Sequence, residues 1–220
     1  MITPEIDKTY KEAKYDLIDR KVEKCRLKVR KGLEIHPFHT RLLILSAYLH
    51  RSKEDYEQAL SELQLAHKHL EDPGLETELR SQISLTFNEI GISTYRQGKY
   101  EEAIRLFTEG LSYGEKDWGM LTNRGDCYRA LNDFVKALED YLAAYEGEKK
   151  NEELSFRIAS IYSIRGVALF NSKNYDLALR EFEEAVRFSP RCPQFQVSRG
   201  KCLLQTGRRQ EAVEALERCL

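Results

Sequence analysis

Apolar and small residues recur at three- and four-residue spacing along almost the whole chain, and this spacing is typical of amphipathic helices. The helical stretches come in pairs, and a short polar break such as Gln97-Gly98-Lys99 separates the two members of a pair. Breaks of this kind end one helix and let the chain turn back. The pattern therefore predicts an all-α fold built from consecutive helical hairpins.

The hairpins repeat with a fixed period, which is clearest between Ser84 and Tyr145. Equivalent residues such as Gly91 and Gly125 lie 34 positions apart. The first copy has its small and aromatic residues at Phe87, Ile90, Gly91, Tyr95, Gly98, Tyr100, Ala103, Phe107 and Gly110. The second copy has Leu121, Arg124, Gly125, Arg129, Asn132, Phe134, Ala137, Tyr141 and Ala144 at the same offsets. One such hairpin cannot bury its apolar face alone, so the period predicts a solenoid of stacked hairpins.

The repeat continues in both directions, with two interruptions. Gly125 and Gly166 lie 41 positions apart, so extra residues fall near 146–153, a charged stretch that forms either a longer loop or a helix overhang. Ten extra residues near 71–80 include a Pro-Gly pair that indicates a turn. We predict a single solenoid domain over residues 1–220, with repeats that start near residues 6, 40, 84, 118, 159 and 193.

The composition fits a folded helical protein without a global charge. The chain has 220 residues, of which 41% are apolar and 32% charged. Its 35 lysine and arginine residues nearly balance 36 acidic residues, so the net charge of −1 gives no overall attraction to nucleic acid or membranes. No apolar run has the length of a signal peptide or a membrane span. We therefore expect a cytoplasmic protein that binds neither nucleic acid nor membrane.

The five cysteines are an odd number without a Cys-x-x-Cys pair, so they indicate neither a disulfide framework nor a structural zinc site. Cys25 and Cys219 take repeat positions that are alanine in other copies, and Cys127 and Cys202 share one helical position. These positions predict buried free thiols in a reducing compartment.

Candidate catalytic and metal-binding residues are few. His36 with His39 and His67 with His69 are the close histidine pairs, and neither has a third ligand at a suitable spacing. No nucleophile elbow, phosphate-binding glycine loop or metalloprotease helix is found. We expect no metal, no cofactor and no enzymatic activity.

Over essentially its whole length the chain resembles the tetratricopeptide repeat family. The resemblance is most specific in the last four repeats, whereas Ala13 and Ala47 replace the usual glycine in the first two. It implies a right-handed α-α superhelix of about six hairpins whose first helices line a concave groove. It also implies a protein-interaction scaffold that holds a partner segment in that groove.

The family's groove positions fall on recurring residues of the first helices. In this chain they are Asn88, Ile92, Tyr95, Arg96, Thr122, Asn123, Asp126, Arg129, Ser163, Val167, Phe170, Asn171, Val197, Lys201 and Leu204. We expect Ile92, Tyr95 and Phe170 to give apolar anchorage, and the Asn123 amide to bond a peptide backbone. The alternative is a solvated wall without a ligand.

Some family members bind the C-terminal tails of heat-shock chaperones through a carboxylate clamp of lysine, asparagine and arginine side chains. Here Asn123 matches the middle asparagine, but Asn88 and Ile92 replace the first lysine and asparagine. Ser160 and Ile164 replace the last lysine and arginine. Without these charged donors a terminal carboxylate is poorly held, so a chaperone adaptor is the less favoured alternative.

Three arginines, Arg124, Arg165 and Arg199, precede the marker glycine of their repeats. A row of arginines along stacked helices offers a grip for an acidic partner. We favour a structural role, in which each stem lies over its hairpin and each head pairs with a nearby acid.

Residues 20–31 hold seven basic residues and one acid. The basic residues are Arg20, Lys21, Lys24, Arg26, Lys28, Arg30 and Lys31. Val22, Cys25 and Val29 keep one face of this helix apolar, so we favour an ordinary solvated convex face for the charges. The alternative is docking to an acidic protein surface such as tubulin tails, or to nucleic acid, although no aromatic stacking platform accompanies the run.

Two short stretches, residues 95–100 and 123–128, resemble family members linked with ciliated cells. This resemblance implies tubulin or ciliary proteins as partners and a place in the cytoskeleton or cilium. The alternative function is then a structural component of a cytoskeletal or axonemal assembly, with contacts over the convex face and loops.

The sixth repeat reaches Leu220 without the polar capping helix that solenoids usually need. Val213, Leu216, Cys219 and Leu220 are therefore expected to be partly exposed. We expect that the chain continues, that it self-associates through this end, or that a partner covers it.

Overall fold

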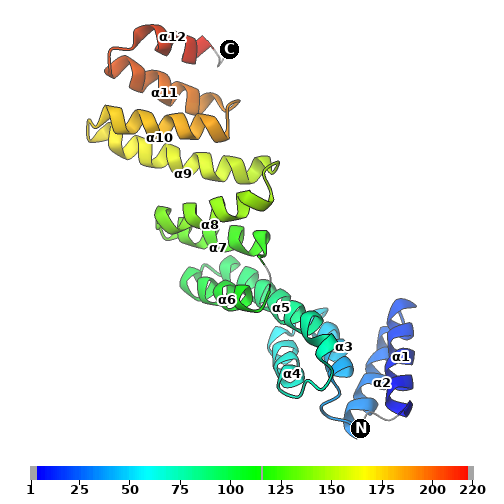
Figure 1. Cartoon of the computed structure of the whole chain (residues 1–220). Helices are drawn as coiled ribbons and strands as arrows, with labels where there is room; N and C mark the ends of the chain where they lie inside the picture. The colour runs from blue at the N-terminus through cyan, green and yellow to red at the C-terminus, as the bar shows by residue number, and fades with distance from the viewer. Residues whose placement is uncertain (1–3, 115, 218–220) are drawn as a thin grey trace. The chain divides into compact units, whose positions relative to one another are not determined.

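The computed structural model describes residues 4–114 and 116–217 (Figure 1). All regular structure in these residues is helical, with twelve α-helices and one short 3-10 helix. The all-α fold predicted from the sequence is therefore confirmed. The chain folds into two compact units, Met1–Met120 and Leu121–Leu220, and each is described by itself.

The first unit is built from three pairs of helices, and in each pair the two members pack side by side (Figure 1). They are α1 (Pro4–Ile18) with α2 (Val22–Ile35), α3 (Thr40–Arg51) with α4 (Tyr56–Lys68), and α5 (Glu76–Arg96) with α6 (Tyr100–Tyr113). The 3-10 helix η1 (Pro73–Leu75) comes directly before α5. Helix α2 also packs on α3, and α4 on α5, so neighbouring pairs stack.

The second unit continues the same plan. Its helices are α7 (Trp118–Ala130), α8 (Phe134–Gly147), α9 (Glu152–Asn171), α10 (Tyr175–Phe188), α11 (Pro193–Gln205) and α12 (Arg209–Glu217). The first three residues of α7 belong to the first unit. Helix α10 packs against both α9 and α11, so second helices join one hairpin to the next.

The extra residues of the two interruptions lengthen first helices. Helices α5 and α9 have 21 and 20 residues, whereas α7 and α11 have 13 each. At the start of α9 the Asn151 side chain accepts a hydrogen bond from the Leu154 N–H at 3.0 Å, which caps the helix well before the expected repeat start. Between a longer loop and a helix overhang, the two possibilities for residues 146–153, the structure has the overhang.

In the third, fourth and fifth hairpins an aromatic ring lies on the marker glycine. A Cβ atom added to Gly91 would lie 2.5 Å from the Phe107 ring, and one added to Gly125 would lie 2.7 Å from the Tyr141 ring. Phe107 and Tyr141 are fully buried. The glycines therefore let the two helices of a hairpin close over a large side chain, which fills the space between them.

The polar break of the hairpins has a left-handed residue at an equivalent place. Gly98 and Gly207 take φ angles of +77° and +79°, which are unstrained for glycine. Four residues with a side chain take the same region at the corresponding position, with φ between 59° and 62°: Arg20, Glu54, Asn132 and Lys173. The turn geometry is thus kept whatever residue occupies it.

Three of the predicted buried thiols lie in the cores, since Cys25, Cys127 and Cys202 each have no exposed surface. Burial raises the pKa of Cys127 to about 12, because the thiolate would be poorly solvated there.

In the last hairpin, Val213 is 49% and Leu216 37% exposed. Cys219 and Leu220 lie outside the described residues, so the expectation that this end is covered stays a prediction.

Candidate functional site

In the first unit the predicted groove residues lie on the last turns of α5. Asn88, Ile92 and Tyr95 are half-buried and Arg96 is exposed. The Tyr95 ring packs on Tyr100 across the turn, with ring centroids 5.4 Å apart. The Tyr95 ring therefore helps to hold the turn of its own hairpin.

On α7, Asp126 already has partners within its own unit. Its Oδ1 accepts a hydrogen bond from the Tyr141 hydroxyl at 2.6 Å, and its other oxygen forms an ion pair with Arg157 of α9. Arg129 lies 3.7 Å from the same carboxylate. Burial and this carboxylate raise the pKa of Tyr141. Asp126 thus connects three helices, a role that the sequence did not reveal because Arg157 is 31 residues away.

The neighbouring α7 positions Thr122 and Asn123 are half-buried. The Asn123 carbonyl accepts a hydrogen bond from the Cys127 thiol at 3.3 Å. This bond belongs to the backbone of the helix and not to the Asn123 amide. The expectation that this amide bonds a peptide stays a prediction.

Helix α9 carries an exposed apolar face that includes one of the predicted groove positions. Val167 is 46% exposed, and two residues outside the predicted set continue its face, Ile164 at 44% and Phe156 at 47%. The eight- and three-residue steps from Phe156 to Val167 keep all three side chains on one side of the helix. We call these three residues the α9 stripe. The spacing of apolar residues in the sequence is the signal by which Phe156 and Ile164 could have been found.

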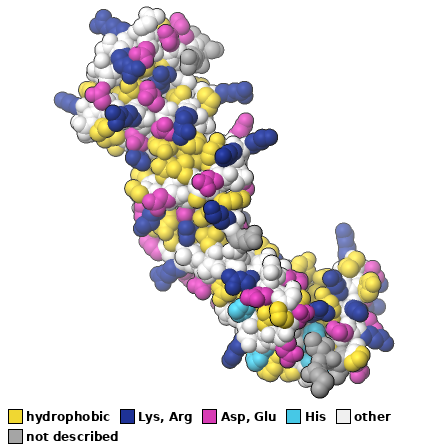
Figure 2. Space-filling model, in the orientation of Figure 1, with side chains coloured by type: hydrophobic (Ala, Val, Ile, Leu, Met, Phe, Trp, Pro, Cys, Tyr) yellow, Lys and Arg dark blue, Asp and Glu magenta, His cyan; other side chains and the backbone are white. Residues whose placement is uncertain are grey.

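The remaining predicted positions of this unit lie on α9 and α11. Ser163 and Phe170 are half-buried, and the Phe170 ring packs edge-on against Tyr175 at 5.2 Å. Asn171 is exposed at the end of α9. On α11, which packs beside α9, Lys201 is exposed and Leu204 is 49% exposed, while Val197 is half-buried. Figure 2 shows hydrophobic side chains gathered on the visible face of this unit.

The arginines before the marker glycines are structural in two repeats. Arg124 donates two hydrogen bonds to the buried Asp140 carboxylate, at 2.8 and 2.7 Å, and this carboxylate raises the pKa of Arg124. Arg165 donates to Glu181 at 2.8 Å. Each acid lies 16 residues after its arginine, in the second helix of the same hairpin. These bonds confirm the structural interpretation for both residues.

Arg199 differs from the other two. Ala215 stands 16 residues after it, where Arg124 and Arg165 have an acid. Its Nε atom is buried and has no hydrogen-bond partner in the described part of the chain. The structural interpretation is therefore not confirmed for this arginine.

Four of the seven basic residues in the run at 20–31 form ion pairs with acids. Lys28 forms ion pairs with Glu12 and Asp16 of α1, at 3.4 and 2.7 Å. The hydrogen bond from Lys28 lowers the pKa of Asp16. Lys21, Arg26 and Arg30 pair with Asp19, Glu23 and Glu34 respectively. The hairpin partner thus supplies carboxylates that the run itself lacks, so this face is less positive than its sequence suggests.

Two further classes of site are missing from residues 4–114 and 116–217. No group of three or more histidine, cysteine, aspartate or glutamate side chains could hold a metal ion there. None of the described helices combines the length and the apolar character of a membrane span.

Comparison with known proteins places the chain in a family. A model described as "Tetratricopeptide repeat" matches residues 88–152 and 165–220. Tetratricopeptide repeat protein 16 of Homo sapiens is 25% identical over 207 residues, which are 90% of this chain and 24% of that protein. The BBSome complex member BBS4 of Bos taurus is 24% identical over 200 residues, 90% of this chain and 35% of that protein.

Two other relatives are similar over a shorter stretch or in fold alone. Hsp70-Hsp90 organizing protein 2 of Arabidopsis thaliana is 29% identical over 146 residues, 64% of this chain and 23% of that protein. The crystal structure of YrrB, described as a TPR protein with an unusual peptide-binding site, aligns with a TM-score of 0.51 at 21% identity, over 87% of this chain and 90% of that one.

The chain spans about a quarter of the length of the tetratricopeptide repeat protein 16 sequences that it matches, 24% in both mouse and human. The family model covers more than half of the chain, in the region where the marker glycines and their buried aromatic partners recur. The chain belongs to the tetratricopeptide repeat family.

Proposed function

We propose that this chain is a non-catalytic scaffold that binds a segment of a partner protein along the first helices of its hairpins. Stacked helical repeats present extended surfaces that suit a long partner segment, and the family as a whole binds proteins. The free, buried thiols suit a reducing compartment such as the cytoplasm. The mode of binding is a peptide or a helix laid along an apolar wall.

The observation that supports this proposal best is the α9 stripe. Phe156, Ile164 and Val167 each leave between 44% and 47% of their surface in water, although other apolar residues of α9 such as Ile158 and Ile161 are fully buried. Burying apolar surface contributes roughly 25 cal/mol per Å², so an apolar side chain of the partner that covers the α9 stripe would stabilise the complex. The extra turns of α9 carry Phe156, so the interruption of the repeat enlarges the wall.

Polar groups on α9 and on the neighbouring α11 would set the register of the partner. Ser160 lies one turn after Phe156, and its hydroxyl donates to the Phe156 carbonyl at 2.7 Å, which leaves its oxygen lone pairs to accept. The exposed Lys201 ammonium on α11 offers a donor and a positive charge. Both suit an extended segment that has backbone N–H groups on one side and a carboxylate near Lys201.

A second candidate function is a structural part of a larger cytoskeletal or ciliary assembly. One relative is named as a member of a complex, and the relatives called tetratricopeptide repeat protein 16 match most of the chain. In this case second helices and loops would make the contacts. The exposed Val135 of α8, at 63%, and Leu177 of α10, at 50%, are apolar residues available for it.

A chaperone adaptor is less well supported. A relative is named for organising Hsp70 and Hsp90, but two of the clamp positions here are Ile92 and Ile164. Ile164 is exposed on the α9 stripe, where an apolar side chain can only disfavour a carboxylate.

Matched variants distinguish these possibilities. The double variant Ile164→Ser with Val167→Ser changes the α9 stripe, and Val135→Ser with Leu177→Ser changes residues on second helices that are more exposed. Proximity labelling with quantitative mass spectrometry is run on both variants after equal helicity and melting have been shown. We expect specific partners to be lost from the first variant and kept by the second. Loss from the second variant alone would favour the structural-assembly function instead.

A further inference from the structure

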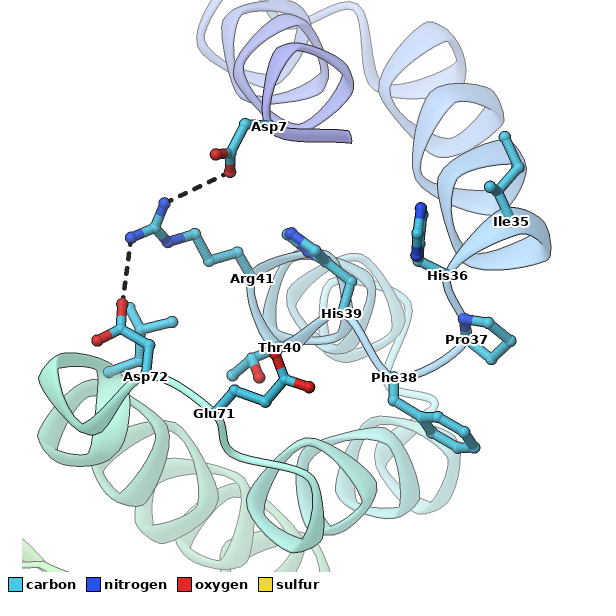
Figure 3. A pocket seen from close by; sticks show the side chains of 11 residues that line it. Asp7, Ile35, His36, Pro37, Phe38, His39, Thr40, Arg41, Glu71 and Asp72 are labelled. Carbon is cyan, nitrogen blue, oxygen red and sulfur yellow. Dashed lines mark hydrogen bonds and ion pairs between the residues drawn. The ribbon is translucent and has the colours of Figure 1, made fainter. Parts of the chain in front are cut away.

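A cavity of about 370 Å³ lies in the first unit, whereas the α9 stripe belongs to the second (Figure 3). Its walls come from the start of α1, from the loop that joins α2 to α3, and from the connection between α4 and α5. Loops that join successive hairpins therefore meet here. The volume is within the range of about 300–1,000 Å³ that is usual for ligand pockets.

The floor of this pocket includes a buried histidine with an unused donor. His39 is only 8% exposed, and its Nδ1 accepts a hydrogen bond from the Leu42 N–H at 3.3 Å as the N-cap of α3. The neutral ring therefore has its proton on Nε2. This Nε2 atom is buried and has no hydrogen-bond partner in the described residues. Burial also lowers the pKa of His39, which keeps the ring neutral.

Figure 3 shows the His39 ring directed into the pocket. A buried N–H group without an acceptor costs free energy, and native proteins rarely leave one unmatched. The His39 Nε2–H group therefore favours a ligand with an acceptor oxygen, such as a backbone carbonyl.

The charged groups of the pocket also favour a cationic ligand. Arg41 lies between Asp7 and Asp72, 3.7 and 3.4 Å from their carboxylate oxygens (Figure 3). Glu71 also lines the pocket and forms no ion pair with any described residue. The pocket lining thus holds three carboxylates and one guanidinium, so an anionic ligand would be repelled.

The opening is bordered by apolar side chains. Phe38 is 51% and Ile35 is 71% exposed, and the Phe38 ring is held by stacking on His69 with centroids 4.1 Å apart. An ordered aromatic ring with an open face suits the alkyl stem or the ammonium of a long cationic side chain.

We propose that this pocket binds a lysine-containing peptide segment, with the lysine ammonium against Glu71 and Asp72 and a backbone carbonyl of the segment accepting the His39 Nε2–H bond. The acceptor, the positive charge and the apolar stem occur together in such a segment. The site does not depend on the α9 stripe, so a scaffold that binds one partner there would hold a second, basic segment at the loops of its first unit.

The test is a titration of the whole chain, labelled with ¹⁵N at its histidines, with three probes. Binding is monitored through the imidazole nitrogen resonances. The probes are the acetylated tripeptide amide Gly-Lys-Gly, the same peptide with norleucine for lysine, and 1,4-diaminobutane. We expect the lysine peptide to shift His39 Nε2 and to bind at least about tenfold more tightly than either other probe. Equal binding of norleucine would overturn the role of charge, and equal binding of the diamine would overturn the peptide assignment.

Variants locate the binding. Glu71→Gln removes an acidic charge, and His39→Ser removes the ring donor while serine keeps an N-cap oxygen for α3. Each is expected to weaken the lysine peptide at least about fivefold. His67→Asn, which lies outside the pocket, and the Ile164→Ser with Val167→Ser variant are expected to leave the titration unchanged. Unchanged binding in both pocket variants, or no His39 shift at saturating peptide, would overturn the proposal.

Discussion

At the scale of single residues, one repeat position shows that the hairpin accepts either a charge pair or apolar packing. Arg124 and Asp140 form a doubly hydrogen-bonded pair with 20% and 8% of their side chains exposed. In the preceding repeat the same two positions are Ile90 and Leu106, which are half-buried. The backbone of the hairpin is compatible with both solutions, so the choice is made by the side chains alone.

This position gives a prediction about stability. Asp140→Ala is expected to lower the free energy of unfolding by about 3 kcal/mol, because it removes the carboxylate that accepts two hydrogen bonds from a largely buried guanidinium. The double variant Arg124→Ile with Asp140→Leu copies the preceding repeat and is expected to regain most of that loss. Urea unfolding followed by circular dichroism measures both. If the double variant is as unstable as the single one, the pair has a role beyond its own charge balance.

At the scale of the helical elements, the turn between the two helices of a hairpin recurs in geometry but not in residue type. Glycine takes the left-handed position in two hairpins, at Gly98 and Gly207, whereas Glu54 and Lys173 take it with a side chain. Left-handed backbone costs most residues with a Cβ atom about 1–2 kcal/mol. The repeated turn is therefore imposed by the packing of the two helices that it joins.

The turn predicts a stabilising change. Lys173→Gly is expected to raise the free energy of unfolding by about 0.5–1 kcal/mol, because glycine relieves the strain but loses more entropy on folding. Asn132→Gly is the matched control, and we expect a smaller gain because asparagine tolerates this region. Thermal and urea unfolding of both variants measure the difference. A loss of stability in Lys173→Gly would show that its side chain contributes contacts that exceed the strain.

At the scale of the whole molecule, each unit has its own buried core, and these cores contain thiols that report on folding. Cys25 lies in the first unit, and Cys127 and Cys202 lie in the second. Cys192 is only half-buried. The chain thus has internal probes of both units without any engineered label.

We predict that Cys192 reacts with iodoacetamide in the native chain at pH 8, whereas the three buried thiols react only on unfolding. For Cys127 the raised pKa alone, about 12 against an ordinary value of 9.0, leaves roughly a thousandfold less thiolate at this pH. Mass spectrometry of peptides after timed labelling, with and without urea, measures each site. Rapid native labelling of Cys25 or Cys127 would mean that the unit around it opens readily.

The sequence was sufficient for the features that arise from local, repeated spacing. Gly91 and Phe107, or Gly125 and Tyr141, are 16 residues apart, and the three- and four-residue periods between them predict both helices and their closure. The all-α fold and the family followed from this pattern, because the same short-range contacts recur in every hairpin.

What only the tertiary structure decided depends on contacts between different elements. Lys28 belongs to a basic run, but the α1 carboxylates of Glu12 and Asp16 neutralise it. Asp126 looked like a groove residue, yet Tyr141 and Arg157 already bind it. His39 lacked a third metal ligand in the sequence, and only the meeting of three segments makes it a buried donor. Periodicity determines which face of a helix a residue occupies, whereas the distance to a charge or a cavity wall on another helix depends on how the helices pack.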